Sequence, residues 1–170
     1  METITKLLDK ISTYQVVNYI IPGSVLCVLL KHLVGYDVIA FSMIENIIIC
    51  YFIGLINSRL GSLVLRPVLK LCKFVEDAPY SDYIKAEKQD AKLTELSDIN
   101  NVFRSFASAM LLLLIAYGIK HIEVIENFMI DNFNWIAILS LLILFICSMR
   151  KQTKFVKDRV EAHKKTKGSI

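Results

Sequence analysis

Residues 138–149 read ILSLLILFICSM and residues 110–119 read MLLLLIAYGI, and neither stretch contains a charged side chain. Both are apolar on every face when wound as helices, so a small soluble bundle could not cover them. The 170-residue chain is 55% hydrophobic, against about 45–50% apolar residues in an ordinary soluble domain. Its mean hydropathy is +0.51, and its apolar residues come in blocks. This pattern is typical of a protein that spans a membrane.

Four such blocks divide the chain. They are residues 11–30, 38–58, 105–119 and 132–149. A bilayer core of about 30 Å needs roughly 20 helical residues, because each residue rises about 1.5 Å. The third block is short, but Arg104 and Lys120 at its ends can reach the headgroups with their charged tips. Because isolated segments in lipid must pair their backbone groups internally, we predict an all-α integral membrane protein with four transmembrane helices.

The basic residues predict the orientation of these helices. The hairpins 31–37 and 120–131 hold two Lys or Arg residues, whereas the N-terminus, the loop 59–104 and the tail from 150 hold the other eighteen. Cytoplasmic loops are enriched in Lys and Arg, so we expect both termini and this long loop in the cytoplasm. No cleavable signal peptide is expected, because the first block is too long for one.

This topology predicts four units along the chain. They are a first transmembrane hairpin (1–58), a cytoplasmic helical loop (59–104), a second transmembrane hairpin (105–149) and a basic cytoplasmic tail (150–170). We expect the tail to continue the fourth span as a helix that frays after Ala162. Its eight Lys or Arg residues are typical of a basic anchor that sets the topology.

The cytoplasmic loop begins with a basic helical face. Arg66, Lys70 and Lys73 are spaced i, i+4 and i+7, and apolar residues fill the positions between them. We expect an amphipathic helix over 59–74 that lies along the inner leaflet, where each cation contributes about 1 kcal/mol. The alternative is that this cluster, together with Arg59, binds an anionic ligand such as a nucleotide or a short nucleic acid.

The rest of the loop predicts two further helices. Ser81-Asp82 is a candidate N-cap for a solvated helix over 83–96, whose charges nearly cancel. Ser97-Asp98 is a second candidate cap, and a helix from there would run through Arg104 into the third span. The third span would therefore leave the membrane as a rigid stalk.

Glu45 is the single charged residue within the four apolar blocks. Counted as helical steps from Val38, it lies about 10 Å into the membrane, where a charge must be neutralised, paired or hydrated. One interpretation pairs it with Lys31 of the first span. The other places Glu45 and Asn46, with Asn18, along an ion pathway in an oligomeric pore.

Pro22-Gly23 interrupts the first span. Pro22 cannot donate to the carbonyl of Asn18, so we expect a kink, and the alternative interpretation is a hinge for gating. Small residues recur four apart at Gly54 and Ser58, and again at Ser105 and Ala109. Such faces allow close helix contacts, either within one chain or between copies.

No pattern of enzyme chemistry is present in the sequence. The three histidines, His32, His121 and His163, lie in separate segments, and the four cysteines form no C-x-x-C pair. The chain has no glycine-rich phosphate loop and no G-x-S-x-G motif. We therefore expect no enzymatic activity, no metal site and no cofactor.

Residues 18–23 read NYIIPG, and a similar stretch occurs in the first span of many small bacterial membrane proteins. With four spans and a charged helical loop, the chain resembles the four-helix membrane effectors of bacterial antiphage defence systems. In such systems a separate sensor or nucleotide-signal enzyme controls a small protein that breaches the inner membrane. No soluble sensor domain is recognisable here, which leaves regulation to a partner or to the basic loop.

The resemblance and the residues together predict a homo-oligomeric pore or membrane-disrupting effector of the inner membrane, controlled through its cytoplasmic loop. Its expected partners are membrane lipids, further copies of the chain, and a cytoplasmic regulatory protein or a nucleotide or oligonucleotide signal. The alternative is a structural membrane subunit that anchors a cytoplasmic partner. A transporter has less support, because the four spans contain no obvious repeat.

Overall fold

The computed structural model describes residues 15–39, 42–87, 89–90 and 92–167. Within them all regular secondary structure is helical, which confirms the predicted all-α class. Four stretches are long and apolar enough to cross a membrane, at Val16–Val34, Met43–Leu71, Lys92–Lys120 and Phe133–Glu161. The expected number of four such helices is therefore confirmed by length and composition.

Short π-helical segments, labelled η, interrupt the first two long helices. In chain order the elements are η1 (Val16–Ile20), α3 (Ile21–Leu29), η2 (Leu30–Val34), α4 (Met43–Leu60), η3 (Gly61–Leu65), α5 (Arg66–Leu71), α6 (Tyr80–Glu87), α7 (Lys92–Lys120), α8 (Glu123–Asp131) and α9 (Phe133–Lys167).

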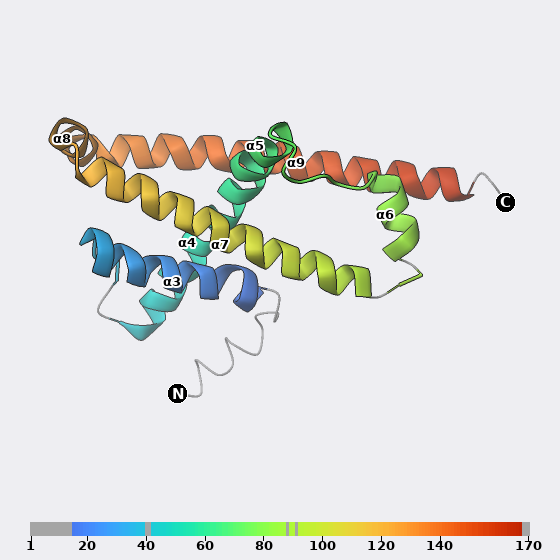
Figure 1. Ribbon diagram of the computed structural model, residues 1–170, viewed down its shortest axis with the longest axis horizontal. Coiled ribbons are helices and arrows are strands. Elements are labelled where there is room, and N and C mark those ends of the chain that lie inside the picture. Colours follow the sequence, from blue (N-terminus) through green and yellow to red (C-terminus); the bar gives the residue numbers. More distant parts are fainter. Residues whose placement is uncertain (1–14, 40–41, 88, 91, 168–170) are drawn as a thin grey trace.

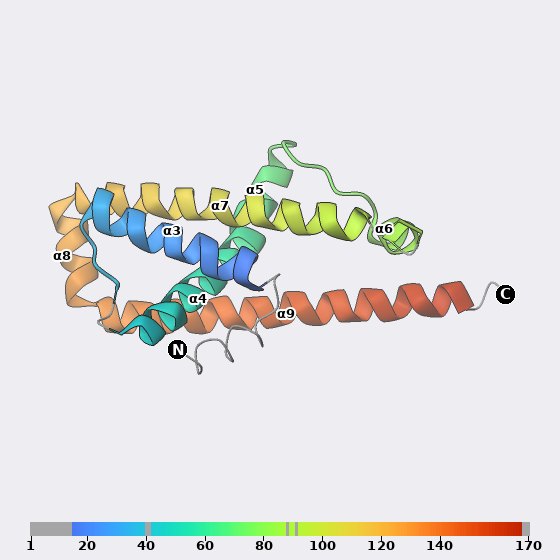
Figure 2. The same ribbon diagram turned by 90° about the horizontal axis from the view of Figure 1, so that it is seen from below.

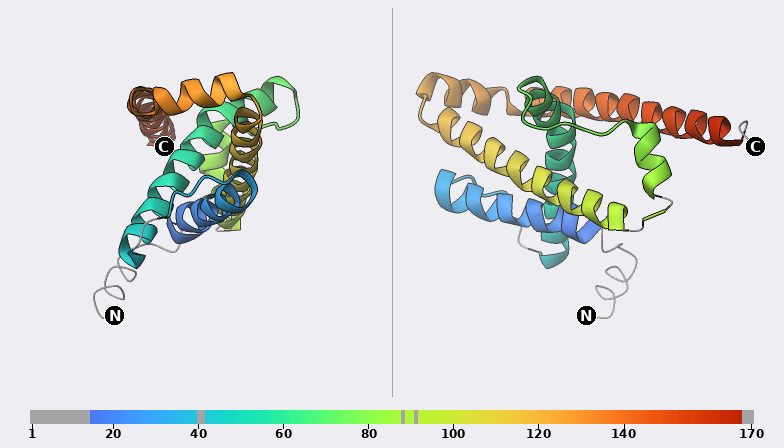
Figure 3. Two further views of the ribbon diagram at one scale, coloured as in Figure 1. Left: turned by 90° about the vertical axis from the view of Figure 1, so that its left-hand side faces the viewer. Right: turned by 45° about the vertical axis from the view of Figure 1, so that its right-hand side comes forward.

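The long helices are not all aligned. α3 and α7 lie side by side along the molecule, and α4 crosses them obliquely (Figure 1). α4 also packs against α9, so that it passes between the α3–α7 pair and α9 (Figures 2 and 3). α8 joins α7 to α9 at one end of the molecule, and α6 packs on α7 and α9 toward the opposite end.

The predicted interruption at Pro22 appears as the π-helical segment η1. The N–H of Ile21 donates to the carbonyl of Val16, five residues earlier, so the helix widens by one residue immediately before the proline. Gly23 then packs against the backbone of α4, where an added Cβ would lie 2.0 Å from the carbonyl oxygen of Cys50. This contact holds the Pro22-Gly23 segment against α4, which favours the structural interpretation over a hinge.

The small-residue faces pack within the chain. An added Cβ on Gly54 would lie 1.9 Å from the carbonyl oxygen of Tyr19, so α4 and η1 touch backbone to backbone. Ser105 and Ala109 of α7 are both fully buried, and Ser58 of α4 is buried too. The structure thus uses both predicted faces for folding of the monomer.

Asn57, which the sequence did not single out, lies at the contact of α4 and α7. Its side chain is fully buried, and its Nδ2 donates to the carbonyl of Ser105 at 2.8 Å. The hydroxyl of Ser108 donates back to the carbonyl of Asn57 at 3.1 Å. Because unpaired polar groups are costly inside an apolar environment, this reciprocal pair fixes the register of the two helices.

The second helix differs from the prediction. A separate amphipathic helix over 59–74 was expected along the inner leaflet, but α4, η3 and α5 form one helical stretch from Met43 to Leu71. η3 allows the chain to continue past Gly61, which packs closely against Ser108 and Arg104. The chain therefore does not break at 58–59, and the basic residues are carried on an extension of the second long helix.

The third and fourth helices extend further than expected. α7 begins at Lys92, earlier than the predicted cap at Ser97-Asp98, and α9 continues to Lys167 rather than fraying after Ala162. The predicted single helix over 83–96 is wrong, because α6 ends at Glu87 and α7 starts after a break. Ile84 of α6 is buried, which fixes this short helix between the two long ones.

Candidate functional site

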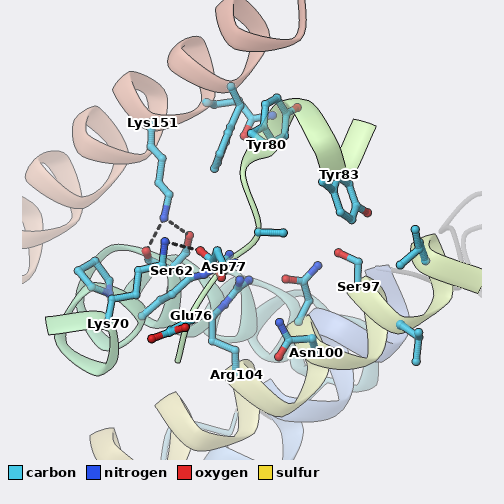
Figure 4. Close-up of a pocket in the computed structure, with 18 of the residues that line it drawn as sticks. Ser62, Lys70, Glu76, Asp77, Tyr80, Tyr83, Ser97, Asn100, Arg104 and Lys151 are labelled. Atoms are coloured by element: carbon cyan, nitrogen blue, oxygen red, sulfur yellow. Dashed lines mark hydrogen bonds and ion pairs between the residues drawn. The ribbon is translucent and has the colours of Figure 1, made fainter. Parts of the chain in front are cut away.

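A cavity of about 900 Å³ lies where α5, α6, α7 and α9 meet (Figure 4). Five cationic side chains line it, namely Arg59, Arg66, Lys70, Arg104 and Lys151. The lining includes two acidic side chains, Glu76 and Asp77, so the wall has a formal excess of three positive charges. Such a concave, positively charged surface concentrates anions.

Three separate helices supply these cations. Arg59 and Arg66 are seven residues apart on the α4–α5 stretch, which is about two helical turns, so they share one face. Arg104 comes from α7 and Lys151 from α9. The cavity is therefore formed by tertiary packing of residues that the chain separates by up to ninety-two positions.

The loop that follows α5 closes one side of the cavity. At the end of α5 the N–H of Phe74 donates to the carbonyl of Leu69 at 2.9 Å, and Lys73 has a positive φ of 56°. This is the geometry of a helix C-terminus that reverses the chain. Residues 72–79, which we call the strap, then connect α5 to α6.

Asp77 of the strap binds two of the cations. Arg66 Nη2 donates to Asp77 Oδ1 at 2.7 Å, and the Lys70 ammonium pairs with the other carboxylate oxygen. Burial raises the pKa of Asp77, but the hydrogen bonds from Lys70 and Arg66 outweigh it and hold the pKa below its ordinary value of 3.8. The carboxylate is therefore ionised at neutral pH.

Lys151 joins α9 to the second helix. Its ammonium donates to the carbonyl of Ser62 and, at 2.7 Å, to the hydroxyl of the same residue. It also lies 5.9 Å from the centre of the Phe155 ring, and that ring contacts Tyr80 of α6 at 6.0 Å. These contacts fix the ammonium at the cavity wall.

The far side of the cavity is polar and aromatic. Figure 4 shows Tyr83, Ser97 and Asn100 on the side opposite Lys151 and Ser62, with Asp77 between the two groups. Hydroxyl and amide groups both donate and accept hydrogen bonds, and a tyrosine ring adds an apolar face. This wall can therefore contact an uncharged organic group.

Three of the four predicted anion-binding residues line the cavity: Arg59, Arg66 and Lys70. Lys73 does not, because it forms the reversing turn after α5. The sequence interpretation missed Arg104, Lys151 and Asp77. Arg104 had been assigned as a cation at the end of the third span and Lys151 to the basic tail, and no sequence signal placed either beside Arg66.

Glu45 lies in the first turn of α4, within the Met43–Leu71 stretch that is long and apolar enough to cross a membrane. Val38 and Ile39 are not helical, so the helical steps counted from Val38 do not apply to this stretch. Ser42 caps the helix, accepting from the Glu45 N–H at 3.3 Å, and Glu45 is exposed in the first turn. The spacing Ser-x-x-Glu is a helix-start signal that could have predicted this.

The predicted pathway residues are spread over different levels. Asn18 is buried in η1, and its neighbour Tyr19 contacts Gly54 of α4. Gly54 follows Glu45 by nine residues, or about 13 Å along the helix. Asn46 is half-buried beside Glu45.

Lys31, considered above as a partner for Glu45, is paired elsewhere. Its ammonium lies 2.7 Å from Asp37, in the loop that precedes α4. Both side chains are about half exposed, so the pair contributes little to stability. The contact joins the C-terminal part of the first long helix to the loop that follows it.

No group of three or more His, Cys, Asp or Glu side chains in the described part of the chain could hold a metal ion. No protein family model matches the chain, and neither a curated protein nor a solved structure matches it. The function must therefore be argued from the cavity and the helices that form it.

Proposed function

We propose that this chain is a multi-pass protein of the inner membrane that acts as a homo-oligomeric pore or membrane-disrupting effector, controlled through the cationic cavity on its cytoplasmic side. The supporting observation is helical continuity. The α4–α5 stretch, α7 and α9 each run without a break from an apolar segment to a cation in the cavity wall. A charge that enters or leaves the cavity therefore acts directly on three membrane helices.

Electrostatics supplies the control step. The cations of three helices repel one another across the cavity, and an anion placed between them reverses that repulsion. Occupancy of the cavity therefore changes the preferred spacing of the helix ends. The equilibrium between the two spacings of the helix ends, with and without ligand, shifts by the difference in the ligand's binding free energy for each spacing.

α9 is the helix best suited to move. In its apolar segment 11% of the residues are buried within the chain, against 28% for the first long helix. Trp135, Ile138 and Leu142 are each more than half exposed along it. Lipid tails or another copy of the chain can cover such a surface. The small-residue faces are already filled within one chain, so contacts between copies would use exposed surfaces such as this one.

Leakage from living cells tests the proposal. Potassium, dye and membrane potential would be followed after induced expression of wild type, Arg104→Gln and Lys73→Gln at matched membrane abundance. Arg104 lines the cavity and Lys73 does not, so depolarisation by wild type should change with Arg104→Gln and persist with Lys73→Gln. Equal depolarisation by all three would contradict control through the cavity.

A structural subunit that anchors a cytoplasmic partner is the second candidate. The helix α9 continues beyond its apolar segment to Lys167, and α6 packs on this extension through an ion pair of 3.7 Å between Arg159 and Glu87. The two helices form a projecting arm that a partner could bind. An intact membrane potential with wild type and both variants would favour this function.

A further inference from the structure

The cavity is already occupied by an anion that the chain itself supplies. The carboxylate of Asp77 sits between Arg66 and Lys70, and its side chain is 28% exposed. Two cations on one helix thus bind two oxygens of a single acidic group. This is how guanidinium and ammonium groups recognise a phosphate.

We propose that the cavity is a binding site for an organic ligand bearing at least two phosphate groups, and that Asp77 occupies one phosphate position until the ligand displaces it. This inference rests on the proposed function, since the cavity is the control site proposed there. It adds the chemistry of the ligand and an internal competitor for it.

The number of cations requires more than one phosphate. With Asp77 in place the wall still has an excess of three positive charges, and displacement of Asp77 raises this excess to four. A single monoanion would leave most of that charge uncompensated. Three of the cations are guanidinium groups, on Arg59, Arg66 and Arg104, and their planar forks bind phosphate oxygens in pairs.

The uncharged wall indicates that the ligand has an organic part. Tyr83 and Asn100 face the cations across the cavity, and Tyr80, Ser97 and Asn101 also contribute to the lining. A cavity of about 900 Å³ is at the upper end of the range of roughly 300–1,000 Å³ for small-molecule sites. Inorganic phosphate alone would fill little of it.

The strap can leave without unfolding a helix. It consists of residues 72–79 between α5 and α6, and Phe74 is 80% exposed. The ion pairs that join it to the cavity cations are those of Asp77 with Arg66 and Lys70, each of which is partly exposed and so contributes little to stability. A ligand with two phosphates replaces one carboxylate by stronger, multiply charged contacts, and the displaced strap reports occupancy to α6.

Calorimetric titration of the full-length protein in phosphatidylcholine nanodiscs tests this. The probes are inorganic pyrophosphate, which carries two linked phosphates, and inorganic orthophosphate. Wild type, Asp77→Asn and Arg66→Gln would be compared, with Glu95→Gln and Lys73→Gln as charge-matched controls whose side chains do not line the cavity. Far-ultraviolet circular dichroism confirms that each variant is folded.

We expect pyrophosphate to bind more tightly than orthophosphate. Asp77→Asn should tighten pyrophosphate binding by about fivefold, the effect of removing a partly exposed competing ion pair, whereas Glu95→Gln should not. Arg66→Gln should weaken binding, and Lys73→Gln should leave it unchanged. Equal affinity of wild type and Asp77→Asn for pyrophosphate, or no binding by either, would overturn the inference.

Two sources of such a ligand are separated by a second set of nanodiscs. Cardiolipin carries two phosphates, and phosphatidylglycerol at equal surface charge carries one per molecule. Weaker pyrophosphate binding in cardiolipin than in phosphatidylglycerol nanodiscs identifies a lipid headgroup, whereas equal binding identifies a soluble ligand. Either lipid result supports the phosphate site. If pyrophosphate does not bind but the wild type still causes leakage, the phosphate site is refuted and the proposed pore is not.

Discussion

Gly54→Ala tests the central crossing of the fold, where α4 meets η1. The added methyl group would lie 1.9 Å from the carbonyl oxygen of Tyr19 and 2.6 Å from its carbonyl carbon. Both atoms belong to the backbone, so no side-chain rotation relieves the overlap. The two helices would have to separate by about 1.6 Å to restore an ordinary contact of about 3.5 Å.

The energetic cost follows from this displacement. Overpacking a close contact costs about 1–3 kcal/mol, and alanine in a helix interior returns about 0.5–1 kcal/mol relative to glycine. We therefore expect Gly54→Ala to lower the free energy of unfolding by up to about 2.5 kcal/mol. Separation of the helices would also loosen the neighbouring contact between Asn57 and Ser105.

The measurement is denaturant-induced unfolding in detergent micelles, followed by circular dichroism. Gly118→Ala is the matched control, because a Cβ at Gly118 in α7 meets nothing within 4 Å. It should be neutral or stabilising by up to about 1 kcal/mol. If Gly54→Ala were as stable as Gly118→Ala, the backbone contact between α4 and η1 would be refuted.

Three further predictions address the register of the helices, the strap and the start of α4. Asn57→Leu should lower the free energy of unfolding by about 1–3 kcal/mol in the same assay, because the carbonyl of Ser105 loses its buried donor. An unchanged stability would contradict a role of Asn57 in fixing the register of α4 and α7. The lowered pKa of Asp77 means that its ion pairs stabilise the strap above pH 3.8 and that this contribution is lost as the pH falls through the folded-state pKa. NMR signals of the strap amides should therefore be constant from neutral pH to 3.8 and broaden below it in wild type, whereas Asp77→Asn should show no such transition. Ser42→Ala should cost about 0.5–2 kcal/mol of unfolding free energy by removing the cap of α4. Glu45→Gln should leave the stability nearly unchanged because the Glu45 side chain is exposed. A large loss of stability with Glu45→Gln would indicate that this side chain is buried.

The four helices that can cross a membrane could be predicted from the sequence because the signal is local. A run such as 110–119 is apolar on every face whatever it packs against. The length of an apolar block can be compared directly with the thickness of the bilayer core. The continuation of α9 beyond its apolar segment was also predictable, since no glycine or proline follows Met149 before Lys167. The small-residue faces were recognisable, but their partners were not.

The start of α4 illustrates a signal that was present and misread. The count of apolar residues began at Val38, whereas the Ser42-x-x-Glu45 capping pattern marks the true helix start. Apolarity alone does not distinguish an extended residue from a helical one. Capping depends on one hydrogen bond at one position, and it places Glu45 in the first turn of the helix.

The amino-acid sequence by itself determined that this protein is helical and that four of its helices can cross a membrane, because both follow from patterns along short stretches. Only the tertiary structure brought Arg66, Arg104 and Lys151 to one cavity and placed Asp77 among them. These residues lie on different helices, and their meeting depends on how α4 crosses α7 and packs against α9. That crossing is set by backbone contact at Gly54 and by the buried Asn57, whose partners no local pattern can identify.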